Sequence, residues 1–358
     1  MERSEFERRH CLLGVSIIDI AALAGVSKST VSAVINNRPN VRPVTRERVM
    51  DAIRQLDYHP NLAARELITA SPMNIGIIMP AYSKNVVGDN KYFSNIDEGS
   101  NLELVSHLVE HVSQTRYGLL VEHTVVANDK PELPAFALSK RVAGIFQISP
   151  LFSSSFIQKL RQYVPAVVEI GIPSTQSDSV YTDFVETGCL SVNYLVRFGH
   201  KRIAFINCDP SSRTVTSRLE GYISGLKKNG LSYDENLVRN SSFTGIGGYN
   251  AFSDIWHSNQ EKPTALICAS STIACGALRF MFQNGISVPD DISIVCNGDS
   301  VLTEFVAPQL TAICRDKGEI AQCAFTLLMD RLNNPDLPLK NVRISDRIIE
   351  RESVKRIL

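Results

Sequence analysis

The sequence predicts an α/β core made of two doubly wound parallel-sheet subdomains, with a small all-α domain in front of it. Short apolar runs alternate with helical stretches over roughly 270 residues from Asn74 onward, a pattern typical of parallel sheets covered by helices on both faces. That segment is long for one sheet, so two subdomains with a cleft between them are the natural division. The first 70 residues carry short helical stripes instead, and 44% hydrophobic content in 358 residues suffices for two or three domains.

Two short helices joined by a tight turn are predicted for residues 16–36. Ser16 and Asp19 have the spacing of a capping box that starts the first helix. Gly25 suits the left-handed end of that helix, and Ser27 caps the second one. Apolar residues recur at helical spacing and should face a common core: Ile17, Ile20, Ala21, Ala24, Val31, Val34 and Ile35.

The outer face of the second helix carries small, polar and singly basic side chains, namely Lys28, Ser29, Ser32, Ala33 and Asn36. Such a face suits base edges in a DNA major groove, although the pattern alone also fits a helical hairpin inside an enzyme.

Two further helices are predicted before the core begins. One covers Pro43–Leu56, with proline in its first turn, and closes a three-helix unit. The other covers Asn61–Leu67 and is capped by Asn61. At about two turns it is marginal in water, so it should form only when something holds it.

Strands and helices then alternate through the core. Strands are predicted over Ile75–Pro80, Tyr117–Val121, Val142–Ile148, Ala166–Ile170, Ile203–Ile206, Thr264–Ala269 and Ile292–Val295. Helices are predicted over Ile96–Thr115, Ser154–Tyr163, Val185–Phe198, Thr216–Asn229, Gly247–Ser258, Thr272–Asn284 and Lys317–Asn333. The Gly245–Gly248 run lacks the preceding strand and the Lys-Ser/Thr pair of a phosphate-binding loop, so we expect a loop that feeds the next helix.

The amino-acid composition excludes several classes of protein function. Basic and acidic residues balance at 37 each, and residues 1–70 carry a net charge of only +2, so any DNA binding depends on where the cations lie. Eight cysteines without a CxxC pair, and histidines without metal-ligand spacing, predict buried free thiols in a reducing cytosol and no metal or cofactor site. The charged N-terminus lacks a signal segment, and no apolar run approaches the roughly 20 residues of a membrane span. With no catalytic constellation either, we expect a cytoplasmic protein that is not an enzyme.

The chain resembles the lac-repressor/galactose-repressor (LacI/GalR) family of bacterial transcription regulators over nearly its whole length after residue 14. Three core segments carry the similarity there: Phe198–Ile206, Arg218–Tyr222 and Val288–Val295. Two N-terminal motifs carry it more specifically, Ile18-Asp19-Ile20-Ala21-x-x-Ala24-Gly25-Val26-Ser27-x-Ser29-Thr30-Val31-Ser32 and Tyr58-x-Pro60-Asn61-x-x-Ala64-Arg65-x-Leu67. The resemblance implies a helix-turn-helix domain, a hinge helix and a periplasmic-binding-protein-like core.

The resemblance also implies which residues contact DNA. Lys28, Ser29 and Ala33 occupy the base-reading positions, and Leu67 corresponds to a wedge leucine that enters the minor groove. Ala33 stands where the family most often has arginine, and alanine offers only a methyl contact, so the operator should differ at that step. The other expected DNA contacts are Ser16, Ser27, Thr30, Ser32, Asn36, Tyr58, Asn61 and Ala64.

In the cleft, the resemblance places Arg218 and Asp183 where the family holds ligand hydroxyls or carboxylates. Phe93 and Phe243 stand where aromatic rings stack on a sugar or base. Two positions depart from the family pattern. Ser270-Ser271 replace a common Asn-Asp pair, and Cys296-Asn297-Gly298-Asp299 replaces a pattern with two aspartates, of which Asp299 keeps the second. These departures favour a larger, differently substituted or partly apolar ligand, or no small ligand, over an ordinary free sugar.

Each cleft residue also has a structural interpretation from the residues alone. Arg218 could make an ion pair, Asp183 could cap the following helix, and the two phenylalanines could belong to the core.

The predicted domains are a charged extension at 1–14, a helix-turn-helix domain at 15–60, a hinge helix and linker at 61–73, and a ligand-binding and dimerisation core at 74–358. The N-subdomain takes residues 74–182 and 314–344, and the C-subdomain takes 183–313 and 345–358. We expect a homodimer that binds a pseudo-palindromic operator in double-stranded DNA under control of a small effector, possibly a sugar derivative. A periplasmic sugar-binding protein is the alternative, but residues 15–67 would then have no role.

Overall fold

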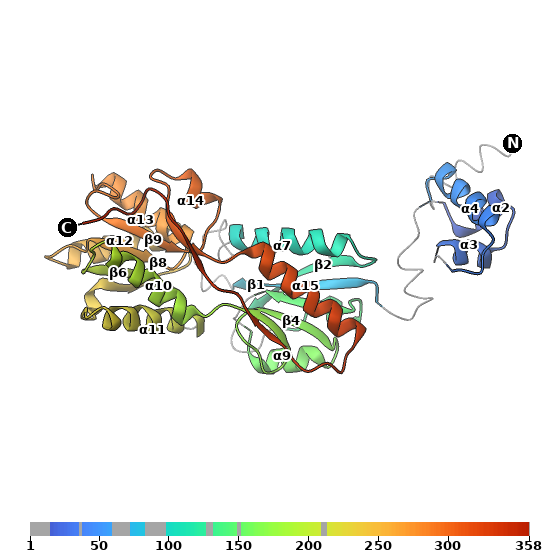
Figure 1. Ribbon diagram of the computed structural model, residues 1–358, viewed down its shortest axis with the longest axis horizontal. Coiled ribbons are helices and arrows are strands. Elements are labelled where there is room, and N and C mark those ends of the chain that lie inside the picture. The colour runs from blue at the N-terminus through green and yellow to red at the C-terminus, as the bar shows by residue number, and fades with distance from the viewer. Residues whose placement is uncertain are drawn as a thin grey trace. The chain divides into compact units, whose positions relative to one another are not determined.

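The computed structural model describes residues 15–35, 38–58, 72–82, 98–126, 132–148, 152–208 and 213–357. Its contacts divide the chain into two compact units, Met1–Ser71 and Pro72–Leu358 (Figure 1). The first unit is helical, and the second contains two α/β sheets whose strands are parallel except at one edge. This architecture confirms the predicted fold class.

The first unit contains α2 (Ile17–Ala24), α3 (Lys28–Ile35) and α4 (Pro43–Gln55). The predicted stripes meet in one small core, whose fully or nearly fully buried members are Ile20, Ala21, Ala24, Val31, Val34, Val49 and Ala52. Pro43 is the first residue of α4, as expected for a residue without a backbone N–H at a helix start.

The first sheet of the larger unit has the strand order β11-β5-β4-β3-β1-β2, with every pair parallel. Helices α7 (Glu98–Ser113) and α15 (Lys317–Asn333) cover one face, while α8 (Ala135–Leu138) and α9 (Ser154–Arg161) cover the other (Figure 1). Its strands are β1 (Asn74–Tyr82), β2 (Gly118–Val126), β3 (Gly144–Ile148), β4 (Ala166–Gly171), β5 (Asp178–Tyr181) and β11 (Asn341–Arg343).

The second sheet has the order β12-β10-β9-β8-β6-β7, parallel except for β12, which runs antiparallel to β10. Its strands are β6 (Ile203–Asn207), β7 (Val238–Asn240), β8 (Ala265–Cys268), β9 (Ser293–Asn297), β10 (Thr311–Cys314) and β12 (Arg347–Ile349). Figure 1 shows the helices around it, namely α10 (Phe184–Arg197), α11 (Arg213–Lys228), α12 (Gly245–Ser258), α13 (Ser271–Gln283) and α14 (Val301–Phe305). The short η1 (Glu235–Leu237) precedes β7.

Three connections run between the two sheets. They are residues 182–183 before α10, residues 315–316 before α15, and residues 344–346 between β11 and β12. The seven predicted strands are confirmed as β1, β2, β3, β4, β6, β8 and β9, whereas β5, β7, β10, β11 and β12 were not predicted. These five strands have only three or four residues each, too few for a hydrophobic period to be read.

The expected loop at Gly245–Gly248 is wrong, because α12 begins at Gly245, two residues before the predicted helix start at Gly247. Thr244 is the N-cap, and its Oγ1 accepts a hydrogen bond from the backbone N–H of Gly247 at 3.0 Å. A Cβ atom on Gly248 would lie 2.1 Å from the carbonyl oxygen of Ile273. The glycine therefore lets α12 approach α13 closely, which is a packing role that the sequence pattern did not reveal.

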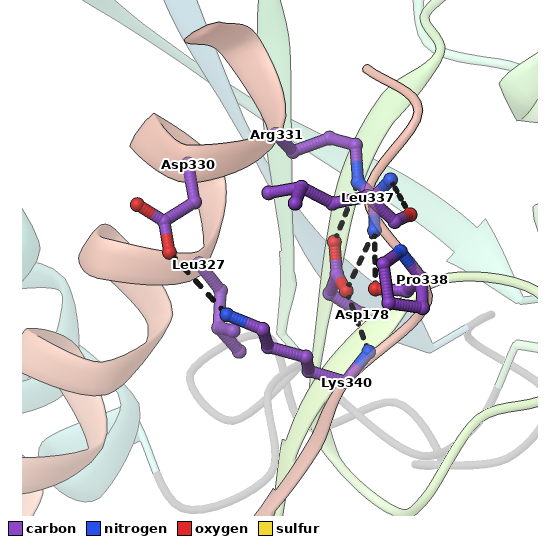
Figure 2. A pocket seen from close by; sticks show the side chains of 7 residues that line it. All are labelled: Asp178, Leu327, Asp330, Arg331, Leu337, Pro338 and Lys340. Atoms are coloured by element: carbon purple, nitrogen blue, oxygen red, sulfur yellow. Dashed lines mark hydrogen bonds and ion pairs between the residues drawn. The ribbon is translucent and has the colours of Figure 1, made fainter. Parts of the chain in front are cut away.

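A buried ion pair fastens the end of α15 to the first sheet. Arg331 Nε donates to Asp178 Oδ2 at 2.9 Å, and both side chains are less than 10% exposed. The same guanidinium donates to the carbonyl oxygens of Pro335, Leu337 and Pro338. Figure 2 shows Arg331 with Asp178, Leu337 and Pro338, and these contacts of the arginine hold the turn between α15 and β11.

Among the described residues, no single helix is long and apolar enough to cross a membrane, and α2 and α3 reach that length only as a pair bent by 104°. The seven cysteines within this part of the chain are all free, and Cys189, Cys208, Cys268, Cys296 and Cys314 are buried.

Candidate nucleic-acid interface and effector site

The turn between α2 and α3 is built by the residues that the sequence singles out. Asp19 Oδ2 accepts hydrogen bonds from the backbone N–H of Ser16 at 2.8 Å and from its hydroxyl at 2.6 Å, which completes the capping box. Gly25 adopts φ +63°, the left-handed conformation that ends α2. Arg48 of α4 donates to the carbonyl oxygen of Ala24 and fixes the turn from the other side. The orientation of α3 is therefore set by backbone and side-chain contacts together.

The start of α3 presents an ordered group of hydroxyls to solvent. Ser27 Oγ caps the helix by accepting from the backbone N–H of Thr30 at 3.2 Å. It also lies 2.8 Å from Ser29 Oγ and 2.8 Å from Thr30 Oγ1. Ser27, Lys28 and Ser29 are exposed, and Lys28 is the one charged side chain in the sequence of α3. This is a surface of hydrogen-bonding groups with a single cation.

The remaining predicted DNA contacts divide into two groups. Ser32 and Ala33 lie further along the same helix and are half-exposed, whereas Tyr58 packs partly against the helical core. Asn36, Asn61, Ala64 and Leu67, and with them the predicted hinge helix, lie outside the described residues.

In the larger unit, four predicted ligand residues follow the ends of strands. Asp183 comes after β5, Phe243 after β7, Ser270 after β8 and Asp299 after β9. Ligands of parallel α/β sheets bind outside the carboxyl ends of the strands, so the chain order places these residues where a ligand is expected. Phe93 lies outside the described residues.

Three of these residues also hold the fold together. Asp183 Oδ1 caps α10 by accepting from the backbone N–H groups of Val185 and Glu186 at 3.0 and 3.2 Å. Ser270 Oγ caps α13 by accepting from the N–H of Ile273 at 3.3 Å. Phe243 is half-buried against the core of the second sheet.

Asp299 is engaged in an ion pair at the end of β9. Its two carboxylate oxygens accept from Arg351 Nη1 and Nη2 at 2.9 and 3.1 Å, and Thr303 donates to the same group. Burial opposes ionisation of Asp299, but the hydrogen bonds from Arg351 and Thr303 and the positive charges of Arg351 and Lys317 hold its pKa below the ordinary value. The carboxylate is therefore ionised at neutral pH and committed to internal partners.

Arg218, from α11, is 8% exposed and lies at the centre of a cation–aromatic cluster. Its guanidinium carbon is 4.7 Å from the ring centroid of Phe184, and that of Arg315 is 5.1 Å from the same centroid. Arg315 Nε lies 3.3 Å from Asp346 Oδ1, and Thr187 donates to the other oxygen of Asp346. The cluster thus joins α10, α11 and two of the three inter-sheet connections.

Sequence reasoning missed Phe184, Arg315 and Asp346. Arg315 follows the unpredicted strand β10, and Asp346 precedes the unpredicted strand β12. Recognising those short strands would have placed both residues at the connections.

Comparison with protein families and with curated relatives gives a consistent assignment. "Bacterial regulatory proteins, lacI family" matches residues 16–61, and "Periplasmic binding protein-like domain" matches residues 192–354. The chain is 29% identical over 349 residues to the catabolite control protein A of Priestia megaterium. The alignment covers 96% of this chain and 100% of that protein. It is also 29% identical over 349 residues to the transcriptional repressor PurR of Haemophilus influenzae (strain PittEE), with 96% and 99% coverage.

Solved structures agree on the fold. The lac repressor dimer bound to operator and the anti-inducer ONPF aligns with a TM-score of 0.78 at 22% identity, over 95% of this chain and 99% of that one. The transcriptional regulator CelR in complex with cellobiose aligns with a TM-score of 0.66 at 24% identity over the same shares. Both the helix-turn-helix and the core of this chain are matched by regulators, and no comparison favours a periplasmic binding protein. The chain combines a DNA-binding domain of the lacI family with a periplasmic binding protein-like domain, and it is a ligand-controlled, DNA-binding transcriptional regulator rather than an enzyme.

Proposed function

We propose that this regulator is a cytoplasmic repressor that binds a pseudo-palindromic operator as a homodimer and responds to a small carbohydrate or carbohydrate derivative. The observation that carries the proposal is the exposed face of α3, which a capped and glycine-terminated turn holds in one orientation. Readout of bases in a major groove requires such a rigid presentation of a few side chains.

The residues of α3 divide the recognition between them. Lys28 and Ser29 read base edges, and Ala33 contributes a methyl contact. Ser27, Thr30 and Ser32 hold phosphates and groove edges, because short hydroxyls reach the DNA backbone without blocking the helix. Ser16, Asn36, Tyr58, Asn61 and Ala64 add backbone contacts, and Leu67 acts as the minor-groove wedge.

Exposed apolar side chains support the homodimer. Phe282 at the end of α13 is 86% exposed and Phe305 at the end of α14 is 82% exposed, with Val301 and Leu302 exposed beside Phe305. A second group, on α7 and β2, consists of Leu102, Val109 and Val121. Exposed apolar groups of this kind mark association surfaces, and a second copy of the chain would cover both at once.

Two structural relatives indicate the chemistry of the effector. CelR was solved in complex with cellobiose, and a lacI-family regulator from Enterococcus faecium was solved with bound ribose. By analogy we place the effector at the carboxyl ends of the strands, with Arg218 as its principal contact and with Asp183, Phe93, Phe243, Ser270 and Asp299 around it. The internal bonds of Asp183, Ser270 and Asp299 leave these three residues to contribute only their remaining lone pairs.

We also propose the functional boundaries. The DNA-reading domain ends at residue 60, the hinge and linker occupy 61–73, and the core begins at 74. The N-subdomain takes residues 74–182 and 314–344, and the C-subdomain takes 183–313 and 345–358. The composition of the two sheets supports this division, since β11 joins the first sheet and β12 the second.

Selection of binding sites from random double-stranded DNA tests the proposal. The full chain should enrich a sequence with two inverted half-sites, because a symmetric dimer presents two copies of α3. Enrichment of one unpaired half-site would contradict the dimer, and enrichment of no sequence would contradict operator binding altogether.

A further inference from the structure

Two buried asparagines end strands β6 and β9, which lie on either side of β8, and each has one polar atom without a partner among the described residues. Asn207 ends β6 and Asn297 ends β9, and they are 1% and 3% exposed. Asn207 Nδ2 donates to the carbonyl oxygen of Val215 at 2.8 Å, and Asn297 Oδ1 accepts from Ser191 Oγ at 2.9 Å. Asn207 Oδ1 and Asn297 Nδ2 are buried, and no atom in the described part of the chain forms a hydrogen bond with either of them. Since a buried polar group normally has a partner, these two atoms require an explanation.

The register of the second sheet places the two asparagines in one row. Strand β8 lies between β6 and β9, with Ile206 opposite Cys268 and Cys268 opposite Cys296. The next residues along each strand are Asn207, Ala269 and Asn297, and Ala269 is 1% exposed. Two strand spacings put the Cα atoms of the asparagines roughly 10 Å apart, with only a methyl group between them in the row. Two amide side chains and one bridging atom can span that distance through two hydrogen bonds of about 2.8 Å.

The hydrogen-bonding chemistry of Asn207 Oδ1 and Asn297 Nδ2 indicates which group can bind to both atoms. Asn207 Oδ1 needs a donor, and Asn297 Nδ2 needs an acceptor. A carboxylate or a phosphate dianion offers no donor, and an ammonium offers no acceptor, whereas an O–H group offers both. We infer that Asn207 and Asn297 form a hydroxyl-binding subsite. Its occupant is a buried water in the ligand-free protein or a hydroxyl group of the effector in the bound protein.

The helices over this row are the ones that carry the proposed effector contacts. Val215 lies three residues before Arg218 on α11, and Ser191 lies on α10, the helix that begins with Phe184. The assignment of this subsite to an effector hydroxyl rests on the proposed function, and it requires that the effector carry a hydroxyl group at this position. The assignment of the subsite to a buried water rests on the two buried amides alone.

Crystal structures of the full chain test the subsite. Without added ligand, we expect an electron-density peak within 2.6–3.2 Å of both Asn207 Oδ1 and Asn297 Nδ2, which is the range of good hydrogen bonds. Crystals soaked in D-ribose or in cellobiose distinguish the sources. A retained water identifies a structural water, and a sugar oxygen in its place identifies an effector hydroxyl. The absence of any peak, with both amides bonded to protein atoms, would overturn the inference.

A pair of variants tests the same subsite in solution. In Ala269→Ser the new hydroxyl lies in the row between the amides and can supply the O–H group, so Tm should stay unchanged or rise. The control Ala204→Ser buries a hydroxyl among apolar residues of β6 and should lower Tm by roughly 2–4 °C. An equal loss of Tm in both variants would contradict the subsite. Neither experiment measures operator binding, so a negative result here would not contradict the proposed regulator function. A failed operator selection, in turn, would not contradict the subsite.

Discussion

Single residues fasten the C-terminal segment of the chain to the second sheet. Gly199 adopts φ +95°, and a Cβ atom there would lie 2.2 Å from the carbonyl oxygen of Ile357, so only glycine fits. His200 is 1% exposed, with Nδ1 3.1 Å from Thr264 Oγ1 and Nε2 3.2 Å from the carbonyl oxygen of Lys355. The carbonyl requires Nε2 to carry the proton, and Nδ1 of the neutral ring can then accept from the threonine. The Gly-His pair of the family motif is thus explained by this attachment.

Burial lowers the pKa of His200 from its ordinary value of 6.5, and its hydrogen bond to Lys355 only partly opposes this. The unfolded chain therefore binds more protons than the folded one just below pH 6.5, and the free energy of unfolding should fall as the pH falls through that value, by at most about 1.4 kcal/mol per pH unit. Denaturant unfolding between pH 8 and pH 5.5 measures the slope. His200→Gln should reduce it, and the exposed-residue control His257→Gln should not. An unchanged slope in His200→Gln would refute the assignment.

At the scale of elements, polar residues that follow the strands serve as N-caps of the next helices. Asp183, Thr244, Ser270 and Asp316 are the N-caps of α10, α12, α13 and α15. Two helix pairs of the second sheet then cross at glycines, α10 and α11 at Gly188 and α12 and α13 at Gly248. These caps and crossings fix where the helices begin at the carboxyl ends of the strands, which favours a preformed site.

The α12–α13 crossing should be sensitive to one methyl group. Gly248→Ala places a Cβ atom against the backbone oxygen of Ile273, which cannot move without shifting a helix, so the variant should lose about 1–3 kcal/mol of unfolding free energy. The matched control Gly245→Ala lies in the same helix turn, and its nearest atom would be 3.8 Å away, so it should unfold like the wild type. Denaturant titration compares them, and equal stability of all three proteins would disprove the close-packing role.

Comparison of the predicted and observed helices and strands shows which parts of the fold the sequence alone could predict. Long runs with a clear period, such as Lys317–Asn333, were predicted to the residue as α15. The short edge strands β11 and β12 pair only through contacts with distant strands, so local periodicity could not reveal them. At the proposed site, the family resemblance pointed to Arg218 and Asp183, which stay predictions, but the sequence did not reveal that the ring of Phe184 lies against Arg218 and Arg315. That cluster depends on tertiary contacts between α11 and two connections.

At the scale of the whole molecule, the chain combines a DNA-binding unit with an α/β unit that carries the proposed effector site and exposed apolar side chains. Because Phe282 and Phe305 are more than four-fifths exposed, replacing them with aspartate removes little from the folded monomer. The double variant should sediment as a monomer and lose at least tenfold in operator affinity. Leu138→Asp, an exposed position on α8, is the control and should stay dimeric. A dimeric double variant would exclude this surface from the interface.

The most direct test of the account is the affinity of the selected operator for the wild type and for Lys28→Ala, measured by fluorescence anisotropy at one fixed salt concentration. Lys28 is the charged side chain of α3, so its loss should raise Kd about tenfold or more for the operator. The rise in Kd should be clearly smaller for an unrelated duplex of the same length. The control Lys262→Ala, at an exposed position of the α/β unit, should leave the Kd for both duplexes unchanged. Equal Kd values for wild type and Lys28→Ala on the operator would contradict base reading by α3.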